Sequence, residues 1–169
     1  AVRRRGAWAR TLLVMWWVLT CEALGLVAAA WLAAEHLVVG DRERFVARNY
    51  RLQAWWTGAI AAALRRVFGM SLTVDGAGHA GPGPVLVLVR HVSSADTLLP
   101  GLCIAAPAGL RLRYVLKHEL LWDPCLDVVG HRTRNVFVRR GTGGSVDANR
   151  MSVAARVVAE SARKRLGQP

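Results

Sequence analysis

A histidine and an aspartate that follow a run of branched apolar residues are the strongest candidates for chemistry in this sequence. The run Leu86–Val89 predicts a buried strand, and His91 and Asp96 come shortly after it with four residues between them. Ligands of open α/β sheets bind beyond the carboxyl ends of the strands. A histidine accepts a proton near neutral pH, and a carboxylate on its second ring nitrogen stabilises the imidazolium that forms. We therefore predict that His91 is a general base oriented by Asp96.

No dedicated nucleophile accompanies this pair. Ser93 and Ser94 are close in sequence, but the Gly-x-Ser-x-Gly elbow of hydrolases is absent. The pair would therefore act directly on a substrate hydroxyl, without a covalent enzyme intermediate. A histidine and an aspartate at this spacing recur by chance, so a structural histidine and a helix-capping Asp96 stay open as alternatives.

Two arginines follow another predicted strand, Val136–Val138. Arg139 and Arg140 would lie at the same edge of the sheet as the histidine and the aspartate. Guanidinium groups bind phosphate through paired hydrogen bonds, so the two arginines are candidates for a phosphate site. Surface charge at the end of a strand is the alternative, above all for Arg139.

Strands and helical segments alternate from residue 69 to the end of the sequence. This pattern predicts an α/β domain over 69–169, with a mixed, mainly parallel sheet and flanking helices. A short helix or turn over 117–123 should end at Pro124. The remaining predicted strands are 70–74 and 112–116, and the remaining predicted helices are 97–106 and 147–166.

Residues 1–68 are predicted to be a helical membrane anchor. The apolar stretch Thr11–Ala34 is long enough to cross a bilayer and is interrupted only by Glu22, which should be protonated, paired or near a surface. A second apolar stretch, Leu52–Leu64, is too short to cross and fits an interfacial helix. One true crossing and a re-entrant or surface-lying pair of helices are equally compatible with these lengths. Two core helices of a soluble protein are the least favoured interpretation.

Composition points to a membrane surface rather than to nucleic acid. The 169 residues carry a formal charge of +12 and are 53% hydrophobic. Basic and apolar residues together favour the anionic cytoplasmic leaflet, and no zinc-finger, recognition-helix or RNA-binding strand pattern is present. The three cysteines are widely spaced, which favours a reduced, cytosol-facing protein, and no histidine has a zinc-ligand spacing with them. We predict no metal site.

Three motifs, in order, resemble those of the lysophospholipid acyltransferases, typified by 1-acyl-glycerol-3-phosphate acyltransferase. His91 to Asp96 matches the His-x-x-x-x-Asp block of that family. Lys117-x-Glu119-Leu120, followed by Pro124, matches a second block, and Phe137-Val138-Arg139-Arg140 matches the Phe-Ile/Val-x-Arg block. The resemblance covers about Val74 to Arg140, behind an apolar anchor of the same general character.

The resemblance implies a membrane-bound acyltransferase of phospholipid synthesis, at the inner (cytoplasmic) membrane with its active site facing the cytosol. His91 would deprotonate the free hydroxyl of lysophosphatidic acid or a related lysophospholipid, and Asp96 would orient His91. The oxygen would then attack the thioester of acyl-CoA or acyl carrier protein, a co-substrate rather than a cofactor. Arg140 would hold the phosphate of the acceptor, and the matching positions Lys117, Glu119 and Arg139 would also contribute to substrate binding.

Two departures from the family pattern suggest alternatives. Cys125-Leu126-Asp127 replaces the small or aromatic residue and glycine that usually follow the proline, and the Phe-Pro-Glu-Gly-Thr-Arg block has no counterpart. We expect either a piece of a longer protein or a degenerate member. A catalytically incomplete, membrane-bound lipid-binding or scaffold fragment is therefore the alternative function. Hydrolysis of a lipid ester is a weaker one, because a simple hydrolase should bring a nucleophile or a metal.

Overall fold

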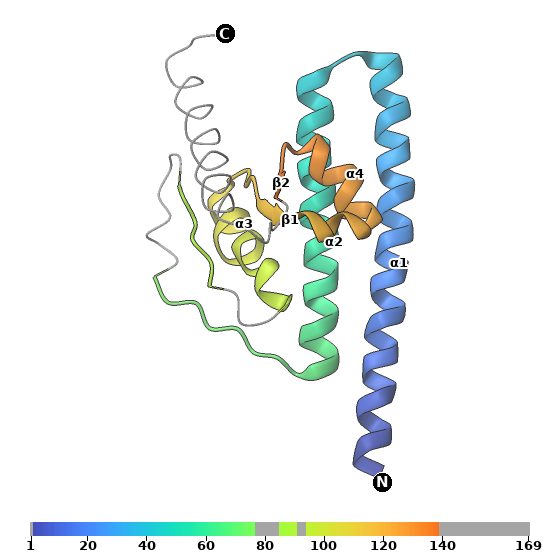
Figure 1. The fold of residues 1–169 in the computed structure, drawn as a ribbon, viewed down its shortest axis with the longest axis vertical. Helices are drawn as coiled ribbons and strands as arrows, with labels where there is room; N and C mark the ends of the chain where they lie inside the picture. Colours follow the sequence, from blue (N-terminus) through green and yellow to red (C-terminus); the bar gives the residue numbers. More distant parts are fainter. Residues whose placement is uncertain (1, 77–84, 91–93, 139–169) are drawn as a thin grey trace, which may run out of the picture. The chain divides into compact units, whose positions relative to one another are not determined.

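The computed structural model describes residues 2–76, 85–90 and 94–138 (Figure 1). The chain divides into two compact units, Ala1–Leu112 and Arg113–Pro169.

Two long antiparallel helices dominate the first unit. Helix α1 spans Val2–Val39 and helix α2 spans Arg42–Phe68, and the two lie side by side as a hairpin (Figure 1). The carboxylate of Asp41 caps α2 by accepting the backbone N–H of Arg44 at 3.0 Å. Gly69 ends α2 in the left-handed region at φ 65°, where a side chain would be strained. The end of α2 thus coincides with the predicted end of the anchor at residue 68, although the compact units divide later, after Leu112.

Two tryptophan hydrogen bonds connect the middle of the hairpin. Trp17 on α1 donates its indole N–H to the carbonyl of Ala59 at 3.0 Å, and Trp56 on α2 donates to Glu22 Oε1 at 2.8 Å. Of the three predicted possibilities for Glu22, namely that it is protonated, paired or near a surface, the structure shows a partner, the indole of Trp56. The side chains buried between the helices are small or apolar apart from Asn49: Val14, Cys21, Ala29, Leu32, Asn49, Leu52, Trp56 and Ala61.

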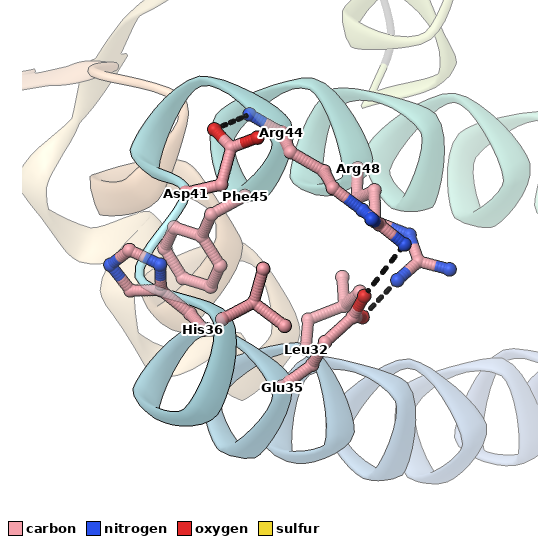
Figure 2. Close-up of a pocket in the computed structure, with 8 residues that line it drawn as sticks. Leu32, Glu35, His36, Asp41, Arg44, Phe45 and Arg48 are labelled. Carbon is pink, nitrogen blue, oxygen red and sulfur yellow. Dashed lines mark hydrogen bonds and ion pairs between the residues drawn. The ribbon is translucent and has the colours of Figure 1, made fainter.

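An ion cluster lies beside the turn of the hairpin. Figure 2 shows Glu35 of α1 facing two arginines of α2, Arg44 at 3.1 Å and Arg48 in closer contact. The ring of His36 stacks on Phe45 with centroids 4.4 Å apart. These contacts join the last turn of α1 to the first turns of α2 and fix the angle at which the chain reverses.

One helix has the length and composition of a membrane span. The segment Gly6–Val39 of α1 has a mean hydropathy of 1.9 in its most apolar window, of which 22% is buried. A core helix or a signal sequence meets the same two criteria. The outward side of α1 nevertheless exposes large apolar side chains along its whole length, among them Trp8, Leu13, Trp16, Leu24, Val27, Trp31 and Val38.

The rest of the described first unit consists of short helical pieces. A 3₁₀ turn, η2 (Ser94–Thr97), leads into a π-helical piece, η3 (Pro100–Ala105), and a single α-turn, α3 (Ala106–Ala108). Gly109, in the left-handed region at φ 63°, ends this run, and η3 packs against α2. The predicted helix over 97–106 is therefore present, although the run changes from 3₁₀ to π to α geometry along its length and contains Pro100 and Pro107, which lack a backbone N–H.

The second unit contains a parallel pair of short strands joined by helices. Strand β1 (Val115–Lys117) pairs with β2 (Val136–Val138) in the register Val115↔Val136 to Lys117↔Val138. The connection is a 3₁₀ helix, η4 (His118–Trp122), followed by α4 (Pro124–Arg132). Cys125 and Val129 of α4 are 1% and 3% exposed and form the core of this unit with Thr133, which is fully buried.

The predicted α/β class is found only in part. The described residues are mostly helical and contain one two-stranded parallel sheet. Residues 70–74 and 85–90 form no strand, so these two strand predictions are wrong for the part of the chain that is described. A strand exists only where a second strand supplies hydrogen-bond partners, and the apolar pattern of one segment carries no information about the other. The predicted helix over 147–166 lies outside the described residues.

Candidate active site

The segment that leads to His91 is extended but not buried. Leu86 and Leu88 are 75% and 87% exposed, and no strand pairs with residues 85–90 among the described residues. The prediction that His91 follows a buried strand is therefore corrected: it follows an exposed extended segment. His91 itself lies outside the described residues, so its pairing with Asp96 stays a prediction.

Asp96 belongs to the 3₁₀ turn η2 and is half-buried. The turn begins a helical run that continues through the buried Pro100 into η3. The N–H of Ala106 bonds to the carbonyl of Gly101, a spacing of five residues that defines the π-turn and is enriched at functional sites. Because η3 packs against α2, the position of Asp96 depends on the long hairpin.

Lys117 and Glu119 are both exposed and lie on either side of the junction between β1 and η4. Lys117 ends the strand, and Glu119 lies in the first turn of η4. Two oppositely charged side chains on an exposed strand end can bind the charged parts of a polar ligand. They belong to the second compact unit, whereas Asp96 belongs to the first, and each is described within its own unit.

The parallel pairing of β1 and β2 brings the ends of two sequence blocks to one edge. Lys117 pairs with Val138, so both strands end at the same level. Parallel strands carry their ligand-binding groups at this carboxyl edge. Arg139 and Arg140 follow Val138 in the sequence and lie outside the described residues.

Strand β2 rests on α4 through an aromatic contact that the sequence analysis missed. The ring of His131 stacks on Phe137 with centroids 5.0 Å apart, and His131 Nδ1 lies 3.0 Å from a carboxylate oxygen of Asp127. Gly130 gives the Phe137 ring its space, since a Cβ there would lie 3.0 Å from Cζ of that ring. The Phe of the third block is therefore a packing residue that fixes β2 against the helix. A glycine within a helix was the available signal.

Asn135 is a second positioning residue that the sequence analysis did not identify. It is 8% exposed, and its Oδ1 accepts the backbone N–H of Tyr114 at 3.0 Å. Its neighbour Val136 donates its own N–H to the carbonyl of Tyr114 at 2.8 Å. The two bonds start the pairing of β1 with β2 and therefore set the register of the edge that carries Lys117.

Helix α4 was also missed, because Pro124 was interpreted as a stop. The prediction that the 117–123 segment ends at the proline is correct, since η4 ends at Trp122. Pro124 is also the first residue of α4, and Asp123 caps it by accepting the N–H of Leu126 at 2.9 Å. Proline is favoured at the first position of a helix, and aspartate is favoured just before it.

Two further features of the described residues bear on the chemistry. No group of three or more histidine, cysteine, aspartate or glutamate side chains within the described ranges could hold a metal ion. The small hollow drawn in Figure 2 lies at the turn of the hairpin and is lined by Glu35, His36, Asp41 and Arg48 among others. The hollow contains none of the predicted site residues. That the reaction needs no cofactor stays a prediction.

Comparison of the chain with models of protein families, with curated proteins and with solved structures found no match.

Proposed function

We propose that this chain is an acyltransferase that moves a fatty acyl group from a thioester donor to the free hydroxyl of lysophosphatidic acid or a related lysophospholipid. The observation that carries the proposal is the order of three blocks in one sequence: His91 to Asp96, Lys117 to Glu119, and Phe137 to Arg140. The parallel register of Lys117 with Val138 supports it, because it brings the second and third blocks to one sheet edge.

The proposed reaction needs only the two substrates and side chains of this protein. His91 takes the proton of the acceptor hydroxyl, and the oxygen attacks the carbonyl carbon of acyl-CoA or acyl carrier protein. The carbon–sulfur bond breaks, and the thiolate leaves and recovers the proton from the imidazolium. Asp96 holds His91 in the tautomer that leaves one ring nitrogen free to accept the proton.

The acceptor phosphate would bind to the basic residues of the second and third blocks. Lys117 is exposed at the end of β1, and Arg139 and Arg140 come next in the sequence after β2. Guanidinium groups make paired hydrogen bonds with phosphate oxygens, whereas an ammonium acts as a point charge. Glu119 would then orient the side chain of Lys117 or accept a hydrogen bond from a hydroxyl group of the acceptor.

A membrane location fits a reaction whose acceptor and product are both lipids. Helix α1 contains a segment that is long and apolar enough to span a bilayer, and its outer side exposes many large apolar side chains. We propose that the chain is held at the cytoplasmic membrane through the α1–α2 hairpin and acts on lipid from the cytosolic side.

The test is transfer of a labelled acyl group from acyl-CoA to lysophosphatidic acid by membranes that carry the full chain. His91→Ala should lower the rate by about 10²- to 10⁴-fold, the range expected for loss of general-base catalysis. His79→Ala is the matched control and should leave the rate unchanged. An His91→Ala variant that keeps its rate would overturn the proposal.

A second function, a noncatalytic membrane-bound lipid-binding protein, is favoured by one observation. Helix α1 exposes many large apolar side chains, and lipid binding through them requires no catalytic residue. This function predicts binding to liposomes without acyl transfer, and equal binding by the wild type and His91→Ala. Acyl transfer above the rate of control membranes would exclude it.

A further inference from the structure

Arginines from two distant stretches of sequence meet at one end of the helical hairpin. Trp17 of α1 contacts Ala59 of α2, and each helix rises about 1.5 Å per residue in opposite directions. Six residues beyond this contact the chain reaches Thr11 on α1 and Arg65 on α2. Arg10 and Arg66 therefore lie within one helical turn of the same level, at the open end of the hairpin. Figure 1 shows this end, where α1 begins and α2 ends.

The two helix segments at this open end carry arginines and contain no acidic residue. Arg10, Arg65 and Arg66 are exposed, and Arg3, Arg4 and Arg5 belong to the first turns of α1. The sequence contains no aspartate or glutamate in residues 1–21 or 54–74. The last carbonyl groups of α2 add a partial negative charge that favours arginines at this position on the helix.

The closed end of the hairpin differs in this respect. Its four arginines, Arg42, Arg44, Arg48 and Arg51, share the end with Glu35, Asp41 and Glu43. Glu35 contacts both Arg44 and Arg48, so much of the positive charge there is balanced within the hairpin (Figure 2). The antiparallel packing thus makes the two ends electrostatically unequal, which the flanking charges of the separate segments do not reveal.

Aromatic side chains lie at the same end as these arginines. Trp8 is 69% exposed, and Phe68, the last residue of α2, is 44% exposed. Tryptophan is enriched at the level of lipid headgroups, where its ring contacts both hydrocarbon and water. Exposed arginines near exposed aromatic side chains match the chemistry of an anionic lipid surface.

We propose that the open end of the hairpin binds the phosphate groups of an anionic phospholipid leaflet through Arg10, Arg65 and Arg66. This inference rests on the proposed membrane location and adds its orientation. The chain leaves α2 at this end, so the segment that leads to His91 starts at the anionic, cytosolic surface. The lysophospholipid acceptor carries the same phosphate chemistry and would be enriched at that surface.

The test is flotation of the purified full chain with phosphatidylcholine vesicles that contain or lack phosphatidylglycerol, at low and at high salt. The wild type should prefer the anionic vesicles, and salt should weaken the preference. Arg65→Gln/Arg66→Gln should lower the preference by roughly 30-fold, about fivefold for each arginine. Arg65→Lys/Arg66→Lys should keep most of it, because the charge remains.

The matched control is Arg42→Gln/Arg51→Gln, which removes two exposed charges from the closed end of the same helix. This variant should keep the preference for anionic vesicles. Equal loss in both glutamine variants, or equal binding of the wild type to both kinds of vesicle, would overturn the inference. Tighter binding to single-stranded RNA than to anionic vesicles at the same salt would also overturn it. If the wild type prefers anionic vesicles but transfers no acyl group, the proposed function is overturned and the lipid-binding inference stands.

Discussion

The indole N–H of Trp56 on α2 donates to Glu22 Oε1 on α1 over 2.8 Å, and this bond joins the two helices near the middle of the hairpin. Apolar contacts between helices are non-directional and tolerate a slide along the helix axes. A hydrogen bond to a carboxylate tolerates no such slide, because its energy depends on distance and angle. The bond therefore fixes a register in which Arg10 lies within one helical turn of Arg66 along the hairpin axis.

Replacing Trp56 by phenylalanine removes this donor and keeps an aromatic ring. We expect Trp56→Phe to lower the free energy of unfolding of the hairpin by about 1 to 3 kcal/mol, because the half-buried carboxyl group of Glu22 loses this hydrogen bond. Unfolding of the full chain in mixed detergent micelles, followed by circular dichroism, measures the change.

Trp55→Phe is the control for this prediction. Trp55 is 45% exposed on the same helix, so the same substitution there should change the free energy of unfolding by no more than about 0.5 kcal/mol. Equal losses for the two variants would show that the Trp56–Glu22 bond contributes nothing specific.

Gly130 of α4 is expected to tolerate no side chain. A Cβ would lie 3.0 Å from Cζ of Phe137, whose ring is held by the stack with His131. Alanine is the better helix former by up to about 1 kcal/mol, but crowding in a packed core costs about 1 to 3 kcal/mol. We therefore expect Gly130→Ala to destabilise the second unit, by about 1 kcal/mol, as measured by urea unfolding.

The same substitution should have the opposite sign in α2. An added Cβ at Gly58 meets nothing within 4 Å, so Gly58→Ala should gain the helix propensity without a clash. Stabilisation at both positions would show that the Phe137 ring moves aside freely. That result would contradict the prediction that stacking on His131 holds the Phe137 ring in place.

We expect ionisation of Tyr114 to lower the stability of the protein at alkaline pH. Burial raises the pKa of Tyr114 above its ordinary value of 10.0. The folded state therefore holds the phenol proton more tightly than the unfolded state, and this contribution is complete below pH 10 and is lost as the pH rises towards the folded-state pKa. In urea unfolding, the urea concentration at the midpoint should decrease as the pH rises above about 10.

Tyr114→Phe separates this effect from general alkaline denaturation. Phenylalanine has no phenol to ionise, so the variant should lose less stability between neutral and alkaline pH than the wild type does. Tyr50→Phe, on α2, should follow the wild type. A Tyr114→Phe variant with an unchanged alkaline slope would contradict the assignment.

The two long helices were predictable because their signals are local. The apolar stretches 11–34 and 52–64 lie within α1 and α2, and Asp41 and Gly69 are the capping residues expected at the start and end of a helix. Helix α2 begins at Arg42, ten residues before the predicted apolar stretch 52–64, because residues 42–51 contain no apolar run. Asp41 caps this part of the helix, and Glu35 of α1 pairs with Arg44 and Arg48 beside it.

The sheet was less predictable, since its signals depend on segments far apart. Residues 112–116 and 136–138 are both predicted as strands, and the pairing of β1 with β2 confirms two strands. The first strand lies at 115–117 and so starts three residues later than predicted. Residues 85–90 have a stronger apolar pattern and pair with nothing among the described residues. The difference lies in Asn135 and Tyr114, whose hydrogen bonds begin the β1–β2 pairing and leave no trace in hydrophobicity.

The sequence predicts candidate site residues by type and order, and it does not predict their geometry. Asp96 is found in a helical turn, whereas Lys117, predicted to begin a helix or turn, is the last residue of β1. The roles of Gly130 and Asn135 were invisible, because packing space and register are properties of two segments together. The base itself, His91, and the phosphate-binding Arg139 and Arg140 stay predictions.

Asp96 offers the sharpest test of the proposed chemistry, because it can be changed without a change of shape. We expect Asp96→Asn to lower kcat for acyl transfer by about 10²-fold or more, since the amide cannot stabilise the imidazolium of His91. KM for the lysophospholipid should stay within about twofold of the wild-type value, because the aspartate acts through the histidine rather than on the acceptor.

A merely structural aspartate would give a different pattern. If Asp96 only capped its turn, Asp96→Ser would restore the capping hydrogen bond and the rate, whereas a carboxylate that orients the base is not replaced by a hydroxyl. Asp75→Asn, at an exposed position of the first unit, is the control and should leave both constants unchanged. Restored activity in Asp96→Ser would remove Asp96 from the catalytic pair, and with it the physical reason for His91 to act as a base.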